Sequence, residues 1–288
     1  MGYPHRNRIA LVALATSLAI VTGCESIQKS ASTKLPIATA KDLRIKAADF
    51  STLDLLLDVG IDNPNPFGLT LSGLSYDFVV NNQPLLQGEQ NNTLRIEAAQ
   101  ESTLSVPLSL TLQTLANEIP EILQSDSFDY ELNTQLQFNL PLLGSFKVPL
   151  TKTGSLPVIR PPRISDVSLA KRKLNLTGAD LDLTVNIENP NAFNLVLNGL
   201  DYTFTGNQNA WAKGKIENAV EVSSKGDSSI KIPLHLDFIA LGTTAFQLLG
   251  GSKEFEAALD GSMTINSSLD FLRNAQLPIH FEKNLSLK

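Results

Sequence analysis

The sequence predicts an all-β protein made of two tandem β-sandwiches of the Greek-key, immunoglobulin-like type, each covered by one α-helix. Three observations lead to this fold class. A stretch of the first half recurs in the second half at a constant offset of 126 residues. Within each copy, apolar and polar residues alternate along several segments, which is typical of half-buried antiparallel strands. One segment per copy has helical spacing instead, so many short strands and a single helix fill about 125 residues.

Residues 1–23 have the composition of a secretory signal peptide. Arg6 and Arg8 supply positive charge, and the apolar run from Ile9 to Val21 is too short to span a bilayer. The run leads into Val21-Thr22-Gly23-Cys24, which resembles the bacterial lipobox, where a signal peptidase cleaves before a lipidated cysteine. We therefore expect Cys24, the sole cysteine, to carry a lipid that anchors the mature chain to a membrane. The alternative is an ordinary signal peptide and an unrelated cysteine.

Glu25 follows the expected lipidation site. In Gram-negative lipoproteins an aspartate at this position resembles the inner-membrane retention signal. Its absence predicts sorting to the outer membrane, with the protein lipid-anchored in the cell envelope and facing the periplasm. Residues 24–36 would then form a polar tether.

Charge and composition exclude several functions. The chain has 23 basic and 29 acidic residues, and loss of the leader with its two arginines leaves a net charge of −8. Such a surface repels phosphate, and no basic run is longer than Lys171-Arg172-Lys173, so we expect no nucleic acid partner. A single cysteine excludes a disulfide scaffold and a zinc ribbon, because structural zinc sites use at least two cysteines, and three histidines do not make a His-rich metal site. We predict no metal, no cofactor and no catalytic residue.

The internal repeat sets the expected domain boundaries. Residues 54–78 align without a gap onto residues 180–204, and 15 of the 25 positions are identical. A repeat of this length makes each copy a full domain rather than a solenoid repeat. We place domain 1 at residues 37–158 and domain 2 at residues 163–288, joined by a short, stiff, proline-containing linker.

Alternation is clearest near the start of each copy. Leucine, valine and isoleucine occupy every second position of residues 53–61 and 181–187. The phase changes at Gly73 and at Gly199, which predicts a bulge or bend in the following strand. Further strands are predicted at residues 104–110, 128–140 and 146–150 in the first copy, and at 230–238, 255–265 and 277–281 in the second. Pro107 and Pro233 interrupt two of these patterns and predict sheet edges, because proline cannot donate to an inner ladder.

One segment of each copy has helical periodicity. Its apolar residues are spaced by four, three and one positions, which places them on one face of an amphipathic helix. They are Leu115, Ile119, Ile122 and Leu123 in the first copy, and Leu241, Ala245, Leu248 and Leu249 in the second, where the helix should end near Gly250-Gly251.

An Asn-Pro-Asn (NPN) turn follows the first alternating strand of each copy, as Asn63-Pro64-Asn65 and as Asn189-Pro190-Asn191. The proline fixes one corner of the chain, and asparagine tolerates left-handed geometry while capping its own backbone. Two interpretations stay open. The turns form a recognition or hydration surface, or they only set the register of the strands.

This motif, an NPN turn after an alternating apolar strand, resembles the late embryogenesis abundant (LEA) type 2 family, also called the water stress and hypersensitive response (WHy) domain. The resemblance covers both copies, roughly residues 40–155 and 164–288. It implies a β-sandwich with one helix, no enzymatic activity, and a link to desiccation and stress tolerance. Pro66 stands where the second copy has Ala192, which leaves open whether both turns do the same job.

Three side chains outside the motif are candidates for chemistry or contact. His235 lies beside Asp237, a pairing that a general base would use, but no nucleophile motif accompanies it and a solvated strand face explains it. His280 is interpreted in the same way. Trp211, the only tryptophan, follows a polar hairpin sequence and is either a contact residue for lipid or protein or a packing residue at the rim.

We therefore expect a non-catalytic envelope lipoprotein that protects proteins or membrane under desiccation or other stress through its polar surface. The alternative is a carrier that binds or transfers a lipid or other hydrophobic ligand, held in an apolar groove between the sheets and beneath the helix. A third class is an adhesin or assembly scaffold that uses exposed edge strands. The expected partners are the membrane, through the lipid on Cys24, and client proteins or a lipid.

Overall fold

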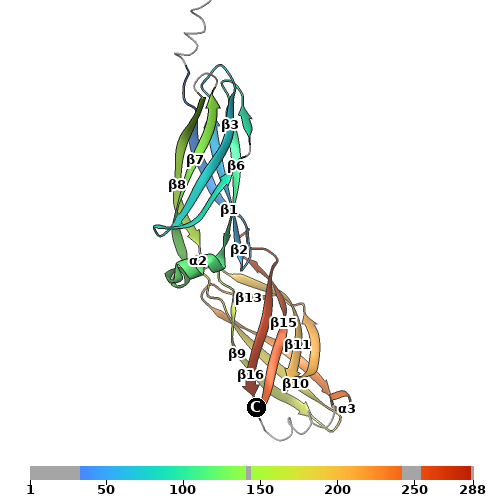
Figure 1. The fold of residues 1–288 in the computed structure, drawn as a ribbon. Coiled ribbons are helices and arrows are strands. Elements are labelled where there is room, and N and C mark those ends of the chain that lie inside the picture. The colour runs from blue at the N-terminus through green and yellow to red at the C-terminus, as the bar shows by residue number, and fades with distance from the viewer. Residues whose placement is uncertain (1–32, 92, 141–143, 242–253, 287–288) are drawn as a thin grey trace, which may run out of the picture.

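The computed structural model describes residues 33–91, 93–140, 144–241 and 254–286, so the signal sequence and Cys24 lie outside the described residues. Strands dominate and form two successive units, which Figure 1 shows one above the other. Among the described residues, the strands up to residue 157 pair only with one another, and so do the strands from residue 163 on. We call these parts unit 1 and unit 2. The predicted all-β class with two repeated sandwiches is confirmed.

Unit 1 is a two-layer sandwich of antiparallel strands. Its elements are β1 (Ile37–Ala48), β2 (Thr52–Asp62), β3 (Leu69–Val80), β4 (Gln83–Gln90), β5 (Leu94–Ile96), β6 (Glu101–Thr111), α2 (Leu112–Glu118), the 3₁₀-helix η1 (Pro120–Gln124), β7 (Ser127–Leu140) and β8 (Gly144–Pro157). One sheet has the order β1-β2-β6, and the other has the order β4-β3-β7-β8 with β5 beside β3.

Unit 2 repeats this plan. Its elements are β9 (Arg163–Leu174), β10 (Gly178–Glu188), β11 (Leu195–Gly206), β12 (Asn209–Ile216), β13 (Val220–Val222), β14 (Asp227–Asp237), α3 (Phe238–Leu241), β15 (Phe255–Ser267) and β16 (Ala275–Leu285). The sheet orders are β14-β10-β9 and β12-β11-β15-β16, with β13 beside β11.

Glycine and proline act in these sheets as the sequence predicts. The register of β3 against β7 shifts between Leu71 and Gly73, and that of β11 against β15 shifts between Asn198 and Leu200. The residue skipped in the second shift is Gly199, whose φ of +60° suits a residue without a side chain. Pro107 and Pro233 lie in β6 and β14, and both strands are sheet edges, which confirms that expectation.

The helical segment of unit 1 differs from the single helix that the apolar spacing predicts. Helix α2 ends at Glu118, and a 3₁₀ turn begins at Pro120, because a proline lacks the N–H that would continue the α-helical ladder. Leu115, Ile119 and Ile122 are buried as expected, whereas Leu123 is half exposed. In unit 2 only α3 is described, and the predicted helix after Leu241 lies outside the described residues.

Each core is built by the alternating strands. Leu53, Leu55 and Leu57 of β2 are at most 2% exposed and face the interior between the two sheets. The corresponding strand of unit 2 buries Leu181, Leu183 and Val185. The other sheet of each unit adds aromatic side chains, such as Phe78 and Phe138 in unit 1 and Phe204 in unit 2, so aliphatic and aromatic groups fill the interior together.

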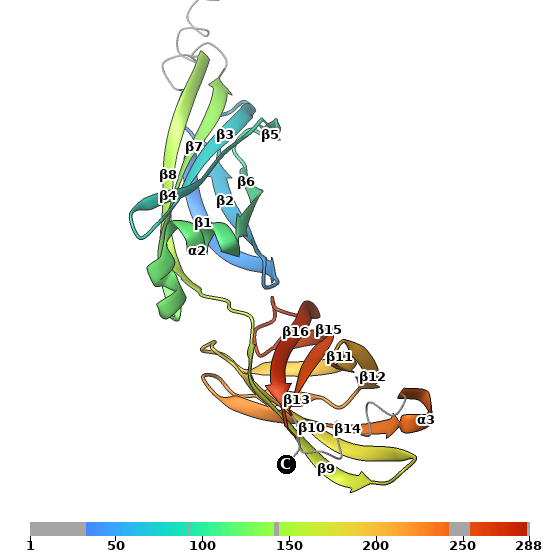
Figure 2. The same cartoon turned by 60° about the horizontal axis from the view of Figure 1, so that its bottom comes forward.

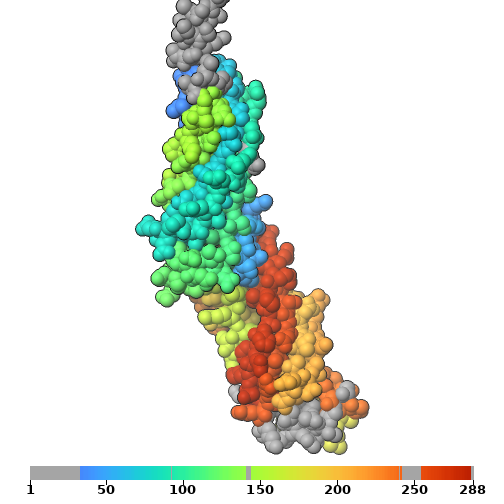
Figure 3. All heavy atoms as spheres, viewed as in Figure 1, coloured from blue at the N-terminus to red at the C-terminus, as the bar shows by residue number. Residues whose placement is uncertain are grey.

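The two units meet end to end, which makes the molecule elongated (Figure 3). Helix α2 and η1 lie at the end of unit 1 that faces unit 2, as Figure 2 shows from a second side. The connection is packed rather than free, because Val158 and Ile159 are both 4% exposed. The backbone N–H of Ala48 also donates to the carbonyl of Phe271 across the junction at 2.8 Å.

No helix in the part of the chain that the structure describes is long and apolar enough to cross a membrane.

Candidate functional site

Each NPN turn carries the chain from one sheet of its sandwich to the other. Asn63-Pro64-Asn65 connects β2 to β3, and Asn189-Pro190-Asn191 connects β10 to β11. All four asparagine side chains are buried, with at most 1% of each residue exposed. A polar amide at such a place must find hydrogen-bond partners inside the protein.

The first asparagine of the motif closes the turn itself. Asn63 Nδ2 donates to the carbonyls of Phe67 and Glu97 at 2.8 and 2.9 Å. Its Oδ1 accepts from the backbone N–H and from Nδ2 of Asn65 at 3.1 and 3.0 Å. Both donors and both acceptor positions of this amide are therefore used.

The same bonds recur in unit 2. Asn189 Nδ2 donates to the carbonyls of Phe193, Val222 and Ser223 at 2.8 to 3.2 Å. Its Oδ1 accepts from the N–H and Nδ2 of Asn191 at 3.0 and 2.9 Å. The exchange of Pro66 for Ala192 leaves this network intact, so both turns make the same contacts.

The last asparagine binds a distant part of the chain. Asn65 accepts from the backbone N–H of Lys34 and donates to its carbonyl, both at 2.8 Å. Asn191 makes the same pair of bonds to Arg160, also both at 2.8 Å. In each unit the partner precedes the asparagine by 31 residues and belongs to the segment that leads into the first strand. The motif therefore holds the leading segment of its own unit.

This geometry places the motif inside the fold. A recognition or hydration surface needs accessible amides, whereas these amides are buried and bonded to backbone groups of the same unit. The backbone of the motif is used as well, because Asn65 O accepts from Ala99 N–H at 2.9 Å and Asn191 O accepts from Lys225 N–H at 3.0 Å. The NPN turn ties the leading segment, the sheet crossover and the loop before β6 or β14 together.

The side chain of Arg160 extends from the same point into the junction. It is 12% exposed and points at the end of η1 in unit 1. Its Nε donates to Leu123 O at 2.9 Å, and Nη2 donates to the carbonyl of Ser125. Carbonyls at the end of a helix lack partners within the helix and attract cations. Nη1 also donates to Pro190 O at 3.1 Å, so one guanidinium contacts both units.

A carboxylate and a lysine complete this contact. Asp126 of unit 1 lies 4.0 Å from Arg160 Nη1 and forms an ion pair with Lys225 of unit 2. Lys225 Nζ also donates to Pro190 O at 2.9 Å. We call Arg160, Asp126 and Lys225 the junction clamp. An open hollow of about 480 Å³ lies beside it, lined among others by Leu123, Pro161 and Glu188.

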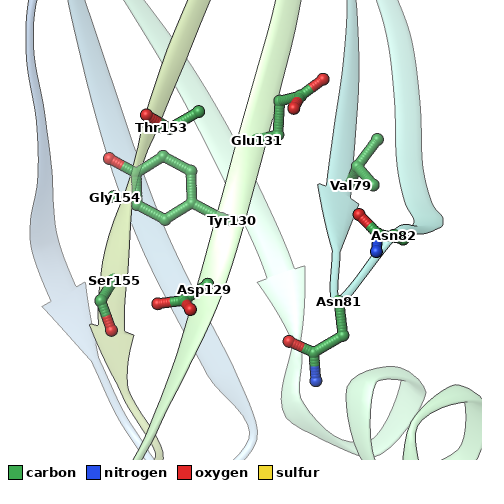
Figure 4. A pocket seen from close by; sticks show the side chains of 9 residues that line it. All are labelled: Val79, Asn81, Asn82, Asp129, Tyr130, Glu131, Thr153, Gly154 and Ser155. Carbon is green, nitrogen blue, oxygen red and sulfur yellow. The ribbon is translucent and has the colours of Figure 1, made fainter.

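A second hollow lies on the larger sheet of unit 1 (Figure 4). It measures about 810 Å³ and is lined by polar side chains of β7 and β8 together with the turn between β3 and β4. Asn81 and Asn82 form that turn, and both have positive φ, as in a two-residue hairpin. Tyr130 stacks on Phe78 with ring centroids 5.5 Å apart, and its burial raises the pKa of its hydroxyl.

Comparison with known protein families decides the assignment. The family model described as late embryogenesis abundant protein matches residues 58–154 and again residues 184–280. Each match contains one NPN turn and most of one unit. The chain belongs to the late embryogenesis abundant type 2 family.

Individual LEA relatives align with about half of this chain. The Late embryogenesis abundant protein Lea14-A of Gossypium hirsutum is 26% identical over 141 residues, which is 49% of this chain and 91% of that protein. The Desiccation protectant protein Lea14 homolog of Glycine max is 24% identical over 132 residues, 46% of this chain and 85% of that protein. The solution structure of a putative late embryogenesis abundant (LEA) protein covers 46% of this chain and 75% of its own, with 21% identity and a TM-score of 0.39.

The two histidines in the described ranges of this LEA type 2 chain, His235 and His280, pair with acids across strands. His235 Nδ1 lies 2.7 Å from Asp180 Oδ1, and His280 Nδ1 lies 2.7 Å from Asp260 Oδ1. The sequence suggested Asp237 as the neighbour of His235, and this is corrected. Residues two apart on one strand are about 6.8 Å apart, whereas directly opposed residues on paired strands are closer. All of these side chains are exposed.

The remaining candidates are placed as follows. Trp211 is 7% exposed and packs against Phe204 and Phe255, with ring centroids 6.0 and 4.7 Å away, so it is a packing residue. No group of three or more His, Cys, Asp or Glu is placed to hold a metal within the described ranges. The lipidation predicted at Cys24 lies outside the described residues. Arg160 and Lys34 were missed by sequence reasoning, because only the repeat offset of 126 relates them and neither belongs to a motif.

Proposed function

We propose that this LEA type 2 protein protects proteins or membranes of the cell envelope during water loss, and that it does so without catalysis. Membership of the family supports a stress-related role. The Glycine max relative is named a desiccation protectant. Protection would act through the outer surface, because the NPN amides are buried.

The observation that carries this proposal is the outward face of β7. Its inward residues are buried, and its outward residues are acids or amides, namely Asp129, Glu131, Asn133, Gln135, Gln137 and Asn139. Opposite them β8 presents hydroxyls such as Thr151 and Thr153. Strand spacing repeats these groups about every 4.8 Å across the sheet and 6.8 Å along it. The sheet thus offers a dense array of donors and acceptors to a surface that is losing water.

Part of this array is already ordered. Thr151 Oγ1 donates to Asn133 Oδ1 at 2.8 Å, and Asn133 Nδ2 donates to Glu131 Oε1 at 2.7 Å. Gln135 and Gln137 are exposed on the same face, and Gln137 Nε2 donates to Ser145 Oγ at 3.1 Å. Ordered polar side chains lose less conformational entropy when they bind, which favours contact with a client or lipid headgroup.

The carrier alternative requires an apolar cavity. The two hollows of about 810 and 480 Å³ are open to solvent, and charged side chains such as Glu131 and Arg160 lie in their walls. The buried apolar side chains of both units pack against one another. These observations favour surface protection over carriage of an acyl chain.

The proposal also includes a location. A lipid on Cys24 would hold the chain at the outer membrane and keep its polar faces close to envelope proteins and lipids. Cys24→Ser should release the protein into the soluble envelope fraction. Retention of the variant in the membrane fraction would contradict the predicted lipid anchor on Cys24. It would leave the proposed protective role untested and unchanged.

The protective role is tested by drying a labile enzyme with the chain from Glu25 onward. Recovered enzyme activity and light scattering after rehydration are compared with those for an unrelated acidic protein of similar size. Gln135→Ala with Gln137→Ala should lower the recovered activity, because two groups of the polar array are lost. The matched control is Gln113→Ala with Gln276→Ala, exposed glutamines outside this face.

Two outcomes would overturn the proposal. If the wild-type chain protects the enzyme no better than the unrelated protein does, the protective function is refuted. Equal loss in both double variants shows that the outward face of β7 is not the protecting surface.

A further inference from the structure

The far end of unit 2 presents two large apolar side chains to solvent. Leu176 and Ile239 are 84% and 82% exposed, more than any other large apolar residue in the described ranges. Leu176 lies in the turn between β9 and β10, and Ile239 lies in α3. The backbone N–H of Phe238 donates to Thr177 O at 3.0 Å, which joins the two segments. We call Leu176 and Ile239 the apolar tip.

Hydrogen bonds hold the tip in its outward position. Asn175 Oδ1 accepts from the backbone N–H of Thr177 and of Gly178 at 2.9 and 2.8 Å. The turn is also closed by Asn175 N–H, which donates to Gly178 O at 3.0 Å. Asp237 Oδ1 accepts from Ile239 N–H at 2.8 Å. The apolar side chains are therefore presented on an ordered backbone and do not need to be ordered again on binding.

Basic side chains accompany the tip. Lys171, Arg172 and Lys173 are consecutive and exposed at the end of β9. Arg172 lies 3.5 Å from Asp182, whereas Lys171 and Lys173 take part in none of the ion pairs within the described part of the chain. Among the nearby acids, Asp180 binds His235 and lies opposite Lys173, Asp182 faces Arg172, and Asp237 accepts from the backbone N–H of Ile239. Lys171 has no acid opposite it, because its partner position is Leu181, and it is available to an anionic surface.

The equivalent end of unit 1 has neither an exposed apolar tip nor a run of basic residues. At the offset of 126, Phe50 corresponds to Leu176, and Ile45-Lys46-Ala47 corresponds to the basic run. Phe50 is half-buried, and this end of unit 1 faces unit 2 through the bond from Ala48 N–H to Phe271 O. The apolar tip and the basic run are therefore features of unit 2 that the described residues of unit 1 do not share.

We propose that the apolar tip and Lys171 to Lys173 dock on the surface of an anionic phospholipid bilayer. The aliphatic side chains enter the boundary between headgroups and acyl chains, and the basic side chains contact lipid phosphates. This inference goes beyond the protective role and does not depend on it.

A second copy of the chain is the competing occupant. The junction within the molecule is a head-to-tail contact, and repeating it between molecules would place the tip against the leading end of unit 1. That end carries Lys34 and Ala99 where the junction clamp has Arg160 and Lys225. The bonds that hold the internal junction cannot be repeated there, which favours the membrane.

The test is co-sedimentation of the chain from Glu25 onward with phospholipid vesicles. Vesicles of phosphatidylcholine with about one third phosphatidylglycerol are compared with pure phosphatidylcholine. Leu176→Asp with Ile239→Asp should weaken partitioning into the anionic vesicles at least about tenfold, since two fully inserted aliphatic side chains are lost. Lys171→Gln with Lys173→Gln should weaken binding to anionic vesicles only, and raising the salt to about 1 M should do the same.

The matched control is Leu35→Asp with Ile37→Asp, which makes the same charge change at exposed aliphatic residues of the opposite end. This control should bind vesicles as the wild type does. Thermal unfolding of each variant verifies its fold. Equal loss in both aspartate pairs, or no binding of the wild type to either vesicle, would overturn the proposal. Self-association of the wild type that Leu176→Asp abolishes, in the absence of vesicle binding, would assign the tip to a second copy instead.

Discussion

At the scale of the residue, an amide suits the last position of the NPN turn because it donates and accepts at once. Asn65 and Asn191 each pair with both backbone groups of a single residue, as a neighbouring strand would. Serine has one oxygen and aspartate has no donor, so neither reproduces this pair. The residue type follows from its partner rather than from the turn.

Asn65→Asp should therefore be strongly destabilising. The carboxylate can accept from Lys34 N–H but leaves the Lys34 carbonyl unpaired and places a charge at a site that is 1% exposed. We expect the free energy of unfolding to fall by about 2–4 kcal/mol in urea titration. Asn191→Asp should behave alike. The control is Asn139→Asp at an exposed position of β7, which should change the free energy of unfolding by less than about 0.5 kcal/mol. Equal effects at the two positions would refute the role given to the buried amides.

Thr134 is a buried residue whose hydroxyl has no hydrogen-bond partner in the described structure. Thr134→Val replaces that hydroxyl by a methyl group and should stabilise the protein by about 1 kcal/mol, since an unpaired polar atom is removed from the interior. Calorimetry should show a rise in melting temperature of about 2–4 °C. Thr134→Ser is the control, because it keeps the hydroxyl and removes packing, and it should lower the melting temperature.

His280 provides a pH-dependent contact. The hydrogen bond to Asp260, and then the charges of Asp260 and Glu282, raise the pKa of His280 above its ordinary value. The folded state thus favours the protonated ring. Its stabilisation is fully present below the ordinary pKa of about 6.5 and is lost as the pH rises through the folded pKa.

NMR titration of the His280 ring should accordingly give a midpoint above about 6.5, and the melting temperature should fall as the pH is raised through that midpoint. The effect should be small, because the pair is exposed, and salt near 1 M should reduce it. His280→Gln should lose this part of the pH dependence. A wild-type midpoint at or below the ordinary value would contradict the pairing.

At the scale of the element, the eight outermost strands of the four sheet orders each carry a feature that resists strand addition. Prolines lie in β4, β6, β8, β14 and β16, namely Pro84, Pro107, Pro149, Pro233 and Pro278. The other edges, β1, β9 and β12, have register shifts in their pairing. Prolines and bulges at edges block further pairing. This pattern disfavours a scaffold that assembles through exposed strands.

Restoring the backbone N–H groups that these prolines lack should show whether the prolines prevent pairing between sheet edges. Pro107→Thr with Pro233→Thr adds two backbone N–H groups to the edges of the smaller sheets. We expect light scattering during refolding to increase several-fold, because edge-to-edge pairing becomes available. Ser105→Thr with Ser229→Thr, on the same strands, should leave scattering unchanged. Scattering that rises equally in both pairs would mean that the prolines do not guard these edges.

The strands that the sequence predicts along most of their length include those with uninterrupted alternation. Strands β2, β7 and β10 are predicted because each keeps a period of two along its length. Strands β1 and β9 were missed because two register shifts in each break that period. The helix of unit 1 was predicted as one piece because the spacing of apolar residues continues across Pro120, where the α-helix is interrupted.

The site was predictable only in its local part. The NPN sequence indicates a turn, and the backbone preferences of asparagine and proline explain it. The bonds from Asn65 to Lys34 and from Asn191 to Arg160 span 31 residues, and no local pattern encodes them. Burial of the four amides likewise depends on two sheets closing over the turn, which only the fold shows.

At the scale of the whole molecule, the junction clamp fixes how the units meet. Arg160 is bound through its backbone to unit 2 and through its guanidinium to η1 of unit 1. Among the described residues, the junction is also crossed by the ion pair of Asp126 with Lys225 and by the hydrogen bond from Ala48 N–H to Phe271 O. The relative orientation of the units therefore depends heavily on one side chain.

Arg160→Ala should loosen the junction while leaving each unit folded, since the backbone pair with Asn191 is kept. Small-angle X-ray scattering should show a broader range of overall dimensions, and limited proteolysis near residues 158–163 should become several-fold faster. Lys34→Ala is the matched control at the equivalent position of unit 1, where no unit precedes it among the described residues. An unchanged scattering profile for Arg160→Ala would assign the orientation to packing alone.

The pairing of each leading segment with an asparagine also decides how the protein responds to mechanical tension. A pull on the N-terminal side reaches Lys34 before it reaches β1, and both backbone groups of Lys34 are bonded to Asn65. Tension passing from unit 1 to unit 2 meets the same device at Arg160 and Asn191. In each unit a side-chain amide must release before the first strand can be peeled from its sheet, so extension is resisted at two successive points along one line of force.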